Sequence, residues 1–252
     1  MVLLVDAGNS RLKWSELDTA GRPSIQQAAA YGDRPALAAF LDLLEAYPHV
    51  VHITLVHVLT HLFAESVQAA CEQRGVHLHS VRSVAQAYGI TNGYQNPMAL
   101  GADRFVGLVA AHRLASGQAS IVIDCGTAIT VDAVECQGQH LGGLILPGLR
   151  LSADALIARA QGRLSFSLEQ PTLFADSTSK AIGGGCLFGL VGAIEGICTR
   201  MQQNMSSPVV RVLTGGDAEY LNAWLPGDYC VQPDLLMHGL AYITEQTLCT
   251  SC

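Results

Sequence analysis

Two short segments carry an aspartate, a small residue and a glycine at the point where an apolar run ends. Asp6-Ala7-Gly8-Asn9 follows Leu3–Val5, and Asp124-Cys125-Gly126-Thr127 follows Ile121–Ile123. Glycine lets the backbone approach a phosphate closely, and the neighbouring amides and hydroxyls then point at its oxygens. A carboxylate at the end of a strand can hold Mg²⁺ against the same oxygens. Each segment could therefore be a phosphate-binding hairpin tip, although one such tip alone is weak evidence because Asp and Gly are ordinary turn residues.

The two segments also match each other in their flanks. When Asp124 is placed on Asp6, Gly126 falls on Gly8, and a second strand follows in both cases. Such self-similarity is typical of an internal duplication. Two such tips facing each other could hold a phosphate chain from both sides, as in the actin, sugar-kinase and Hsp70 superfamily, which the sequence resembles. A further turn, Thr214-Gly215-Gly216, also follows an apolar strand and favours this interpretation.

A third segment carries groups suited to an acceptor substrate. Phosphoryl transfer needs a positioned hydroxyl, a group that accepts its proton, and positive charge near the transferred phosphate. Asp103, at the start of an expected helix, is a candidate base, and Arg104 is a fork-shaped donor for an anionic group. The alternative is that both residues only cap the helix and pair on its surface.

The residue pattern of this third segment indicates one family within the superfamily. Tyr94-x-Asn96-Pro97-x-x-Leu100-Gly101-Ala102-Asp103-Arg104 resembles the substrate-binding segment of type III pantothenate kinases. Other matching pieces follow the family's order and run nearly end to end: Asp6-Ala7-Gly8-Asn9-Ser10, Asp124-Cys125-Gly126-Thr127-Ala128, Gly142–Gly148, Ser177–Ile182 and Thr214-Gly215-Gly216. The resemblance implies ATP-dependent phosphorylation of pantothenate to 4'-phosphopantothenate, the first step of coenzyme A biosynthesis.

The resemblance also implies roles for individual residues. The first ATP-phosphate loop would comprise Asp6, Ala7, Gly8, Asn9, Ser10, Arg11, Leu12 and Lys13, and Thr127 would contact ATP from the second. Pantothenate would be contacted by Tyr94, Gly101, Ala102, Asp103, Arg104 and Thr178, with Asp103 as general base. ATP would bind with Mg²⁺, and Asp124 would hold a monovalent cation, K⁺ or NH₄⁺. Family members are homodimers, in which Thr178 would reach the pocket of the partner chain.

Three positions need comment because they depart from the family pattern or from simple helix chemistry. Ser10 stands where many members have Thr, which keeps a hydroxyl. Lys13 is followed by Trp14 in only part of the family, so Lys13 is either a phosphate ligand or a strand-edge lysine. Gly183-Gly184-Gly185 lies inside an expected helix, where each glycine costs about 1 kcal/mol relative to alanine. These glycines are better explained by close packing than by phosphate contact.

The elements around these segments predict an α/β protein of two ribonuclease-H-like domains related by duplication, with a nucleotide cleft between them. The expected domains are 1–116, with the first phosphate loop and the substrate segment, and 117–252, with the second loop and the Gly-Gly turn; Ser116-Gly117 is a tight join. Beyond the hairpins, we expect strands at Val50–Val58, Val76–Val81, Leu141–Leu146 and Val209–Leu213. Helices are expected at Pro35–Tyr47, Leu62–Arg74, Met98–Leu114, Leu149–Ala160, Ser179–Met205 and from Asp234.

Composition and residue patterns argue against several other classes of protein. Of the 252 residues half are apolar and 14% charged, and the net charge of −7 lacks the basic footprint of a nucleic-acid surface. The N-terminus lacks the pattern of a signal peptide, and we expect no apolar stretch to reach the roughly 18 residues that a membrane span needs. A cytoplasmic protein with eight free thiols is expected. The Cys249/Cys252 pair and the closely spaced histidines lack the partners of a zinc site.

Two rival functions stay open at this point. One is another enzyme of the same superfamily, such as a sugar kinase or a polyphosphate phosphatase, although the compact chain has little room for the extra polar loops of a sugar site. The other is a nucleotide-binding regulator without enzymatic activity, because the family includes proteins first described as Bvg accessory factors. ATP binding or hydrolysis without pantothenate-dependent turnover would favour the regulator.

Overall fold

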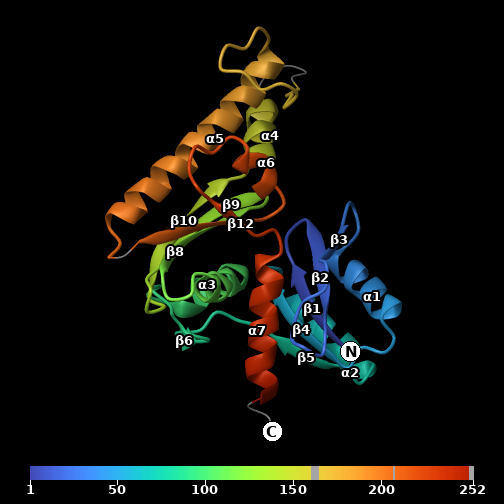
Figure 1. Cartoon of the computed structure of the whole chain (residues 1–252). Helices are drawn as coiled ribbons and strands as arrows, with labels where there is room; N and C mark the ends of the chain where they lie inside the picture. Colours follow the sequence, from blue (N-terminus) through green and yellow to red (C-terminus); the bar gives the residue numbers. More distant parts are fainter. Residues whose placement is uncertain (160–164, 207, 250–252) are drawn as a thin grey trace. The chain divides into compact units, whose positions relative to one another are not determined.

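The computed structural model describes residues 1–159, 165–206 and 208–249, and within them the chain divides into two compact units (Figure 1). Unit 1 comprises Met1–Ser116, Gly138–His140 and Asp234–Cys252, and unit 2 comprises Gly117–Gln137 and Leu141–Pro233. The C-terminal helix therefore belongs to unit 1. The domain limits expected from the sequence, 1–116 and 117–252, stay a prediction.

Unit 1 is built on a five-stranded sheet in the order β3-β2-β1-β4-β5. Its strands are β1 (Val2–Ala7), β2 (Arg11–Leu17), β3 (Gln27–Ala30), β4 (His52–His57) and β5 (His77–Ser80). The first three strands are antiparallel neighbours, and β4 and β5 continue parallel to β1. Strand β1 is central and almost continuously buried, which explains its unbroken apolar run.

Helices cover both faces of this sheet. They are α1 (Ala36–Ala46), α2 (His61–Gln73), α3 (Ala102–Leu114) and α7 (Leu235–Cys249). Leu3, Val5 and Ala7 alternate along β1 and pack with apolar residues of α1 and α2. On the opposite face the Thr54 hydroxyl lies 2.7 Å from that of Thr244 on α7, and α7 packs closely on α3 (Figure 1).

Unit 2 repeats the same sheet order, β10-β9-β8-β11-β12. Its elements are β8 (Ala119–Cys125), β9 (Ala128–Val134), β10 (His140–Pro147), α4 (Leu149–Arg159), α5 (Thr178–Gln203), β11 (Val209–Thr214), α6 (Ala218–Asn222) and β12 (Cys230–Val231). Strand β8 is antiparallel to β9 and parallel to β11, just as β1 is to β2 and β4. The apolar core lies between this sheet and α5 and α6.

Several short elements were not foreseen from the sequence. Strand β3 has the sequence QAAA, which carries no strand pattern, and β6 (Gln86–Ala87), β7 (Ile90–Thr91), α6 and β12 are only two to five residues long. The helix expected from Met98 begins later: a 3-10 turn, Pro97–Ala99, precedes α3. The expected helix end at Ala160, and Cys252, lie outside the described residues.

Helix α5 corrects one expectation from composition. An 18-residue window within Thr178–Gln203 has a mean hydropathy of 1.7, long and apolar enough by that test to cross a membrane, and 39% of it is buried. The prediction that no stretch reaches this length was wrong, because Ile, Leu, Val, Phe and Cys recur among the glycines along most of this helix. One such helix is weak evidence for a membrane span, because core helices of soluble proteins pass the same test.

Two of the three glycines at 183–185 pack closely, as expected, whereas a Cβ on Gly185 would meet nothing within 4 Å. A Cβ on Gly183 would lie 1.9 Å from the Ser167 carbonyl oxygen, and one on Gly184 would lie 2.7 Å from that of Thr172. The chain before α5 therefore lies directly against the first turns of the helix, where only glycine leaves enough space.

Candidate active site

The first hairpin tip joins β1 to β2. The Gly8 amide donates to the Arg11 carbonyl at 3.2 Å, which closes the turn. Asp6 pairs in register with Lys13, and the Lys13 Nζ lies 3.5 Å from the Asp6 Oδ2. The aspartate is only 5% exposed, so this cation stabilises a carboxylate that would be costly to bury alone.

The predicted residues of this tip differ in what they can offer a ligand. Asn9, Ser10 and Arg11 are exposed, whereas the Leu12 side chain is buried in the core and could contribute only its backbone. Tyr31 buttresses the tip, since its amide donates to the Ser10 carbonyl at 3.1 Å. Burial, with a smaller contribution from the Asp6 carboxylate, raises the pKa of Tyr31 to about 12.

The second hairpin tip joins β8 to β9 and is tighter. The Gly126 amide donates to the Ala128 carbonyl at 3.1 Å, and Thr127 stands exposed at the apex. The Gly148 amide donates to the Thr127 carbonyl at 3.0 Å, and a Cβ on Gly148 would lie 2.5 Å from the Gly126 carbonyl oxygen. The Pro-Gly turn after β10 thus packs directly under the tip.

The turn after β11 packs against the same tip. Thr214 pairs in register with Asp124, and Gly215 follows with φ +95°, a conformation that favours glycine. A Cβ on Gly215 would lie 2.4 Å from the Asp124 Oδ1, and the Asp217 amide donates to the Cys125 carbonyl at 3.0 Å. The Gly126 and Gly215 turns therefore both lie near the Asp124 carboxylate, and Gly148 packs on the tip itself.

The third predicted segment lies in unit 1, at the beginning of α3. Gly101 is the N-cap, and Asp103 lies in the first turn with its Oδ1 accepting from the Arg104 amide at 2.7 Å. The Arg104 side chain is 9% exposed, and its Nη1 donates to the Tyr94 Oη at 2.8 Å. Arg104 is therefore not a solvated surface residue, which disfavours the alternative that the pair merely decorates the helix.

Two residues that organise this segment were missed from the sequence. The buried Asn92 donates to the Ser83 Oγ at 3.0 Å and to the carbonyls of Val84 and Pro97, and its Oδ1 accepts from the Tyr94 amide. The ring of His140 stacks on that of Tyr94 with centroids 5.9 Å apart. An Asn before Gly in a polar loop was a weak signal for the first, whereas nothing local in the sequence pointed to His140.

Thr178 is the first residue of α5 in unit 2, after the Ser177 N-cap, whose Oγ accepts from the Lys180 amide. It lines an apolar cavity of about 530 Å³ between α4, α5 and the end of β10. The predicted site residues thus fall into two groups. Unit 1 holds the first tip and the segment Tyr94–Arg104, and unit 2 holds the second tip and Thr178.

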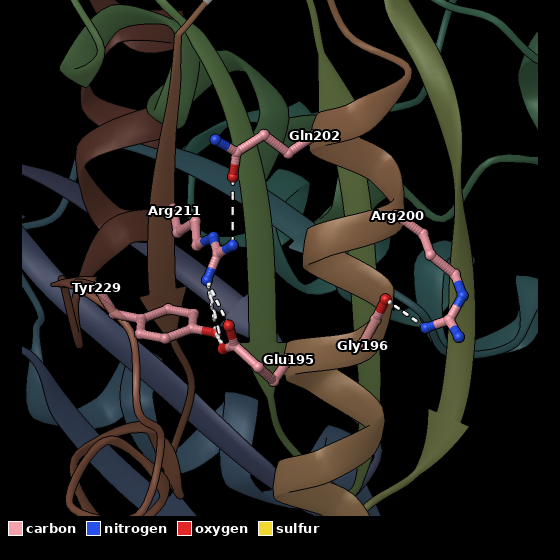
Figure 2. Close-up of polar contacts among 6 residues, drawn as sticks. All are labelled: Glu195, Gly196, Arg200, Gln202, Arg211 and Tyr229. Carbon is pink, nitrogen blue, oxygen red and sulfur yellow. Dashed lines mark hydrogen bonds and ion pairs between the residues drawn. The ribbon is translucent and has the colours of Figure 1, made fainter.

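A second polar cluster in unit 2 has a structural role (Figure 2). The Arg211 Nη1 lies 3.1 and 3.3 Å from the two carboxylate oxygens of Glu195, and the Tyr229 hydroxyl donates to Glu195 at 2.7 Å. The Arg211 Nη2 also donates to Gln202 at 3.2 Å. The hydrogen bond from Tyr229 holds the pKa of Glu195 below its usual value. Because these charges satisfy each other, the cluster joins α5 to β11 rather than binding a ligand.

The chemistry of both tips fits a nucleotide with a divalent ion. Backbone amides, the hydroxyls of Ser10 and Thr127, and the Lys13 ammonium suit phosphate oxygens, and the carboxylates of Asp6 and Asp124 are hard oxygen ligands. Within the described residues, no three His, Cys, Asp or Glu side chains form a group that could hold a metal ion. A divalent ion here would complete its shell with phosphate and water oxygens, which is how Mg²⁺ is usually bound.

Comparison with known proteins agrees with this chemistry. Residues 2–200 match the family model described as type III pantothenate kinase. A type III pantothenate kinase of Alkalilimnicola ehrlichii is 38% identical over 246 residues, covering 97% of this chain and 98% of the relative. One of Nitrosococcus oceani is 34% identical and covers 98% and 95%.

Solved structures show the fold. A Campylobacter jejuni protein described as a Baf family transcriptional activator has a TM-score of 0.63 at 21% identity and covers 98% of both chains. The polyphosphate/ATP-glucomannokinase of an Arthrobacter species has a TM-score of 0.53 at 11% identity and covers 98% of both. The expected α/β fold of two ribonuclease-H-like domains is confirmed, and so is the family: this chain belongs to the type III pantothenate kinases.

Proposed function

We propose that this protein transfers the γ-phosphate of ATP to the primary hydroxyl of pantothenate, which makes 4'-phosphopantothenate and opens coenzyme A biosynthesis. The observation that carries the proposal is the start of α3, where a carboxylate and a buried guanidinium held by Tyr94 stand on adjacent residues. Pantothenate has the two matching groups, a hydroxyl to be deprotonated and a carboxylate to be bound.

Asp103 is the proposed general base. Its Oδ1 accepts from the Arg104 amide, which fixes the orientation of the carboxylate in the first turn of α3. This arrangement requires glycine at position 101, because a Cβ on Gly101 would lie 2.6 Å from the same Asp103 oxygen. The proton of the substrate hydroxyl passes to Asp103 as its oxygen attacks the γ-phosphorus, and the bond from that phosphorus to the β–γ bridging oxygen breaks, which releases ADP.

Arg104 is the proposed binding group for the substrate carboxylate, together with Tyr94, Gly101 and Ala102. A guanidinium offers five N–H donors in one plane, of which Nη1 serves the Tyr94 hydroxyl. Tyr94 thereby fixes the plane of the fork, and a fixed fork suits two-point recognition of a carboxylate.

The phosphates of ATP are bound by the residues Asp6 to Lys13 and by Thr127 in this proposal. Asp6 on the first tip would hold Mg²⁺, which would neutralise negative charge on the phosphate oxygens. Asp124 holds a monovalent cation, K⁺ or NH₄⁺. The cradle of Gly215 around its Oδ1 supports this role, because backbone oxygens and one carboxylate are the ligands that a large, weakly hydrated cation prefers.

A homodimer is proposed from the apolar surface of unit 2. Large side chains stand exposed on β10 and α4, among them Leu144, Ile145 and Leu156, and the cavity that Thr178 lines is open between α4 and α5. A second copy would cover this surface and bring Thr178 to its partner's substrate. A dimer that dissociates when Leu156 is replaced by Lys, measured by light scattering, would support this arrangement. We also propose a cytoplasmic location.

The test is a coupled assay with ATP, Mg²⁺ and pantothenate, run with and without K⁺ or NH₄⁺. Pantothenate-dependent turnover is expected, and it should collapse in Asp103→Asn, by about 10²- to 10⁴-fold as for other general bases, while the unfolding temperature stays near that of the parent. ATP binding without any pantothenate-dependent turnover would instead favour a nucleotide-binding regulator. Unchanged turnover in Asp103→Asn would exclude Asp103 as the base.

A further inference from the structure

The short turn between β9 and β10 packs away from the sheet to which these two strands belong. Residues Gly138–His140 join β9 to β10 of unit 2, yet they pack within unit 1. The Thr91 amide donates to the Gly138 carbonyl at 2.9 Å, and the Gln139 Nε2 donates to the Thr91 carbonyl at 3.5 Å. The turn is therefore fastened to β7, a few residues before Tyr94.

The contact with β7 is also sterically tight. Gly138 has φ +83°, and a Cβ on it would lie 1.8 Å from the Gly89 carbonyl oxygen. Any other residue would have to move the turn away from the loop. The place of the next two residues, Gln139 and His140, is thus set by backbone contacts and not by a flexible side chain.

His140 is the residue that this turn delivers. Its ring is 1% exposed and lies nearly parallel to that of Tyr94, with an interplanar angle of 17° and centroids 5.9 Å apart. The Gly93 amide donates to the His140 Nδ1 at 3.5 Å, so Nδ1 accepts this hydrogen bond. The histidine thus contacts both the ring of Tyr94 and the backbone beside it.

Tyr94 in turn contacts Arg104 in two ways. Its hydroxyl accepts from the Arg104 Nη1 at 2.8 Å, and the guanidinium carbon lies 5.5 Å from its ring centroid. A tilt of the Tyr94 ring would move the hydroxyl and with it the guanidinium. The series His140, Tyr94, Arg104 is therefore a physical connection from the β9–β10 turn to the carboxylate-binding group.

We infer that His140 is a positioning residue for substrate recognition, which sets the plane of the Tyr94 ring and so the direction of the Arg104 guanidinium toward the carboxylate of the acceptor. The inference rests on the proposed function, since it takes Tyr94 and Arg104 to bind pantothenate. His140 itself touches neither ATP nor the reacting oxygen in this scheme. Its loss should therefore weaken binding of the acceptor and leave ATP binding intact.

The test compares three variants at one position. His140→Ala removes both the stacking and the acceptor, His140→Leu fills the volume without either, and His140→Phe keeps the stacking alone. We expect Ala and Leu to raise the KM for pantothenate by about tenfold, the upper range for one aromatic pair, with the KM for ATP within about twofold of the parent. We expect Phe to recover most of the loss. His61→Ala, an exposed histidine on α2, is the matched control.

The outcomes separate the two proposals. If the parent phosphorylates pantothenate and Arg104→Ala raises its KM, while His140→Ala and His140→Leu leave it unchanged, the inference is wrong and the proposed function stands. An equal rise in both KM values, or a Phe variant as impaired as the Ala variant, would also contradict a positioning role through stacking. If the parent does not turn over pantothenate, both are overturned. The Leu variant keeps the test decisive if His140→Ala fails to fold.

Discussion

Hairpin β1–β2 of unit 1 and hairpin β8–β9 of unit 2 each place an aspartate one residue before the end of the first strand. In the first, Lys13 stands opposite Asp6 and its ammonium contacts the carboxylate. In the second, Thr130 stands opposite Asp124, and the close approach comes from the Gly215 backbone. The same sheet order thus places a lysine opposite one strand-end carboxylate, and a threonine opposite and a glycine turn beside the other.

This difference suits different roles for the two aspartates after duplication. Asp6 is compensated within its own hairpin, so the first tip can remain folded without a ligand. At the second tip Thr130 takes the place of the lysine, and the Gly215 turn lies against the Asp124 carboxylate. A monovalent cation at Asp124, K⁺ or NH₄⁺, remains part of the proposal. Four experiments test this comparison of the two hairpins.

The largest effect is expected at Gly215. Gly215→Ala adds a Cβ at φ +95° and 2.4 Å from the Asp124 Oδ1, so either the turn after β11 or the carboxylate must move. A displacement of about 1 Å at a phosphate-binding group can cost about 10²-fold in rate. We expect a loss of turnover on that order and a rise in the K⁺ concentration needed for half-maximal activity, measured in the coupled assay.

Gly192→Ala is the control for that substitution. Gly192 is an exposed glycine of α5, and a Cβ there meets nothing within 4 Å. It should leave turnover unchanged and raise helix stability by up to about 1 kcal/mol. If Gly215→Ala behaved in the same way, the glycine cradle would have no part in function, and the contrast between the two tips would lose its main support.

The repeated sheet and most of its elements could be predicted because they follow from local patterns. The apolar run of β1, the Asp-x-Gly turn and the register that pairs Asp6 with Lys13 are all local, and the second hairpin repeats them. By contrast, α7 packs on β1 and α3, far away in sequence, and His140 at the start of β10 contacts Tyr94 although the two are distant along the chain. Such contacts depend on tertiary packing, which a single sequence does not encode at any fixed spacing.

The candidate site shows the same limit on prediction. The sequence predicted a base at Asp103 and an anion-binding group at Arg104 from the residue types. Only the structure shows that Arg104 is buried and hydrogen-bonded to Tyr94. The sequence also left Lys13 open between two roles. The ion pair with Asp6 explains its position on the strand without deciding whether it also contacts phosphate.

Acidification should lower the stability of the two units to different extents, because all nine histidines lie within the segments of unit 1. His52 stacks on His77 with ring centroids 4.9 Å apart. Burial, and then the neighbouring His77 and His79, lower the pKa of His52 to about 4, against an ordinary value near 6.5. The unfolded chain therefore binds a proton before the folded one does.

The sign of the effect follows from that order. The stability due to neutral His52 is fully present above about pH 6.5 and is lost as the pH falls toward 4, by at most about 3 kcal/mol. We expect unit 1 to unfold first on acidification, as followed by hydrogen exchange at pH 5 and pH 7.5. His52→Gln should flatten the pH dependence. Equal acid sensitivity of both units, or an unchanged profile in the variant, would contradict this assignment.

Lys13 offers the most direct test of the first tip. Lys13→Met removes the cation but keeps the length of the side chain, and it leaves Asp6 buried beside an apolar group. We expect a loss of about 2 kcal/mol in the free energy of unfolding, less than for a fully buried pair because Lys13 is partly exposed. Thr130→Val, at the equivalent position of unit 2, should cost less than about 1 kcal/mol.

Kinetics of the same variant resolve the open role of Lys13. If the lysine also binds phosphate, Lys13→Met should raise the KM for ATP by tenfold or more, in addition to the loss of stability. If the lysine is only the partner of Asp6, the double variant Lys13→Met/Asp6→Asn should regain stability. Its KM for ATP should then equal that of Asp6→Asn alone. A fully stable Lys13→Met protein would mean that the pair contributes nothing to the tip.

The smallest effect is expected at Tyr31, whose amide buttresses the first tip as the Gly148 amide buttresses the second, but which also carries a phenol side chain. Its Oη is buried without a hydrogen-bond partner, whereas its amide holds Ser10. Tyr31→Phe keeps the ring and the amide and removes only this unsatisfied hydroxyl, so stability should be unchanged or rise by about 1 kcal/mol. Chemical denaturation of the ligand-free protein measures this. A loss of 1 kcal/mol or more would show that the hydroxyl is bonded in solution, and the first tip would then rest on a second polar contact besides the lysine.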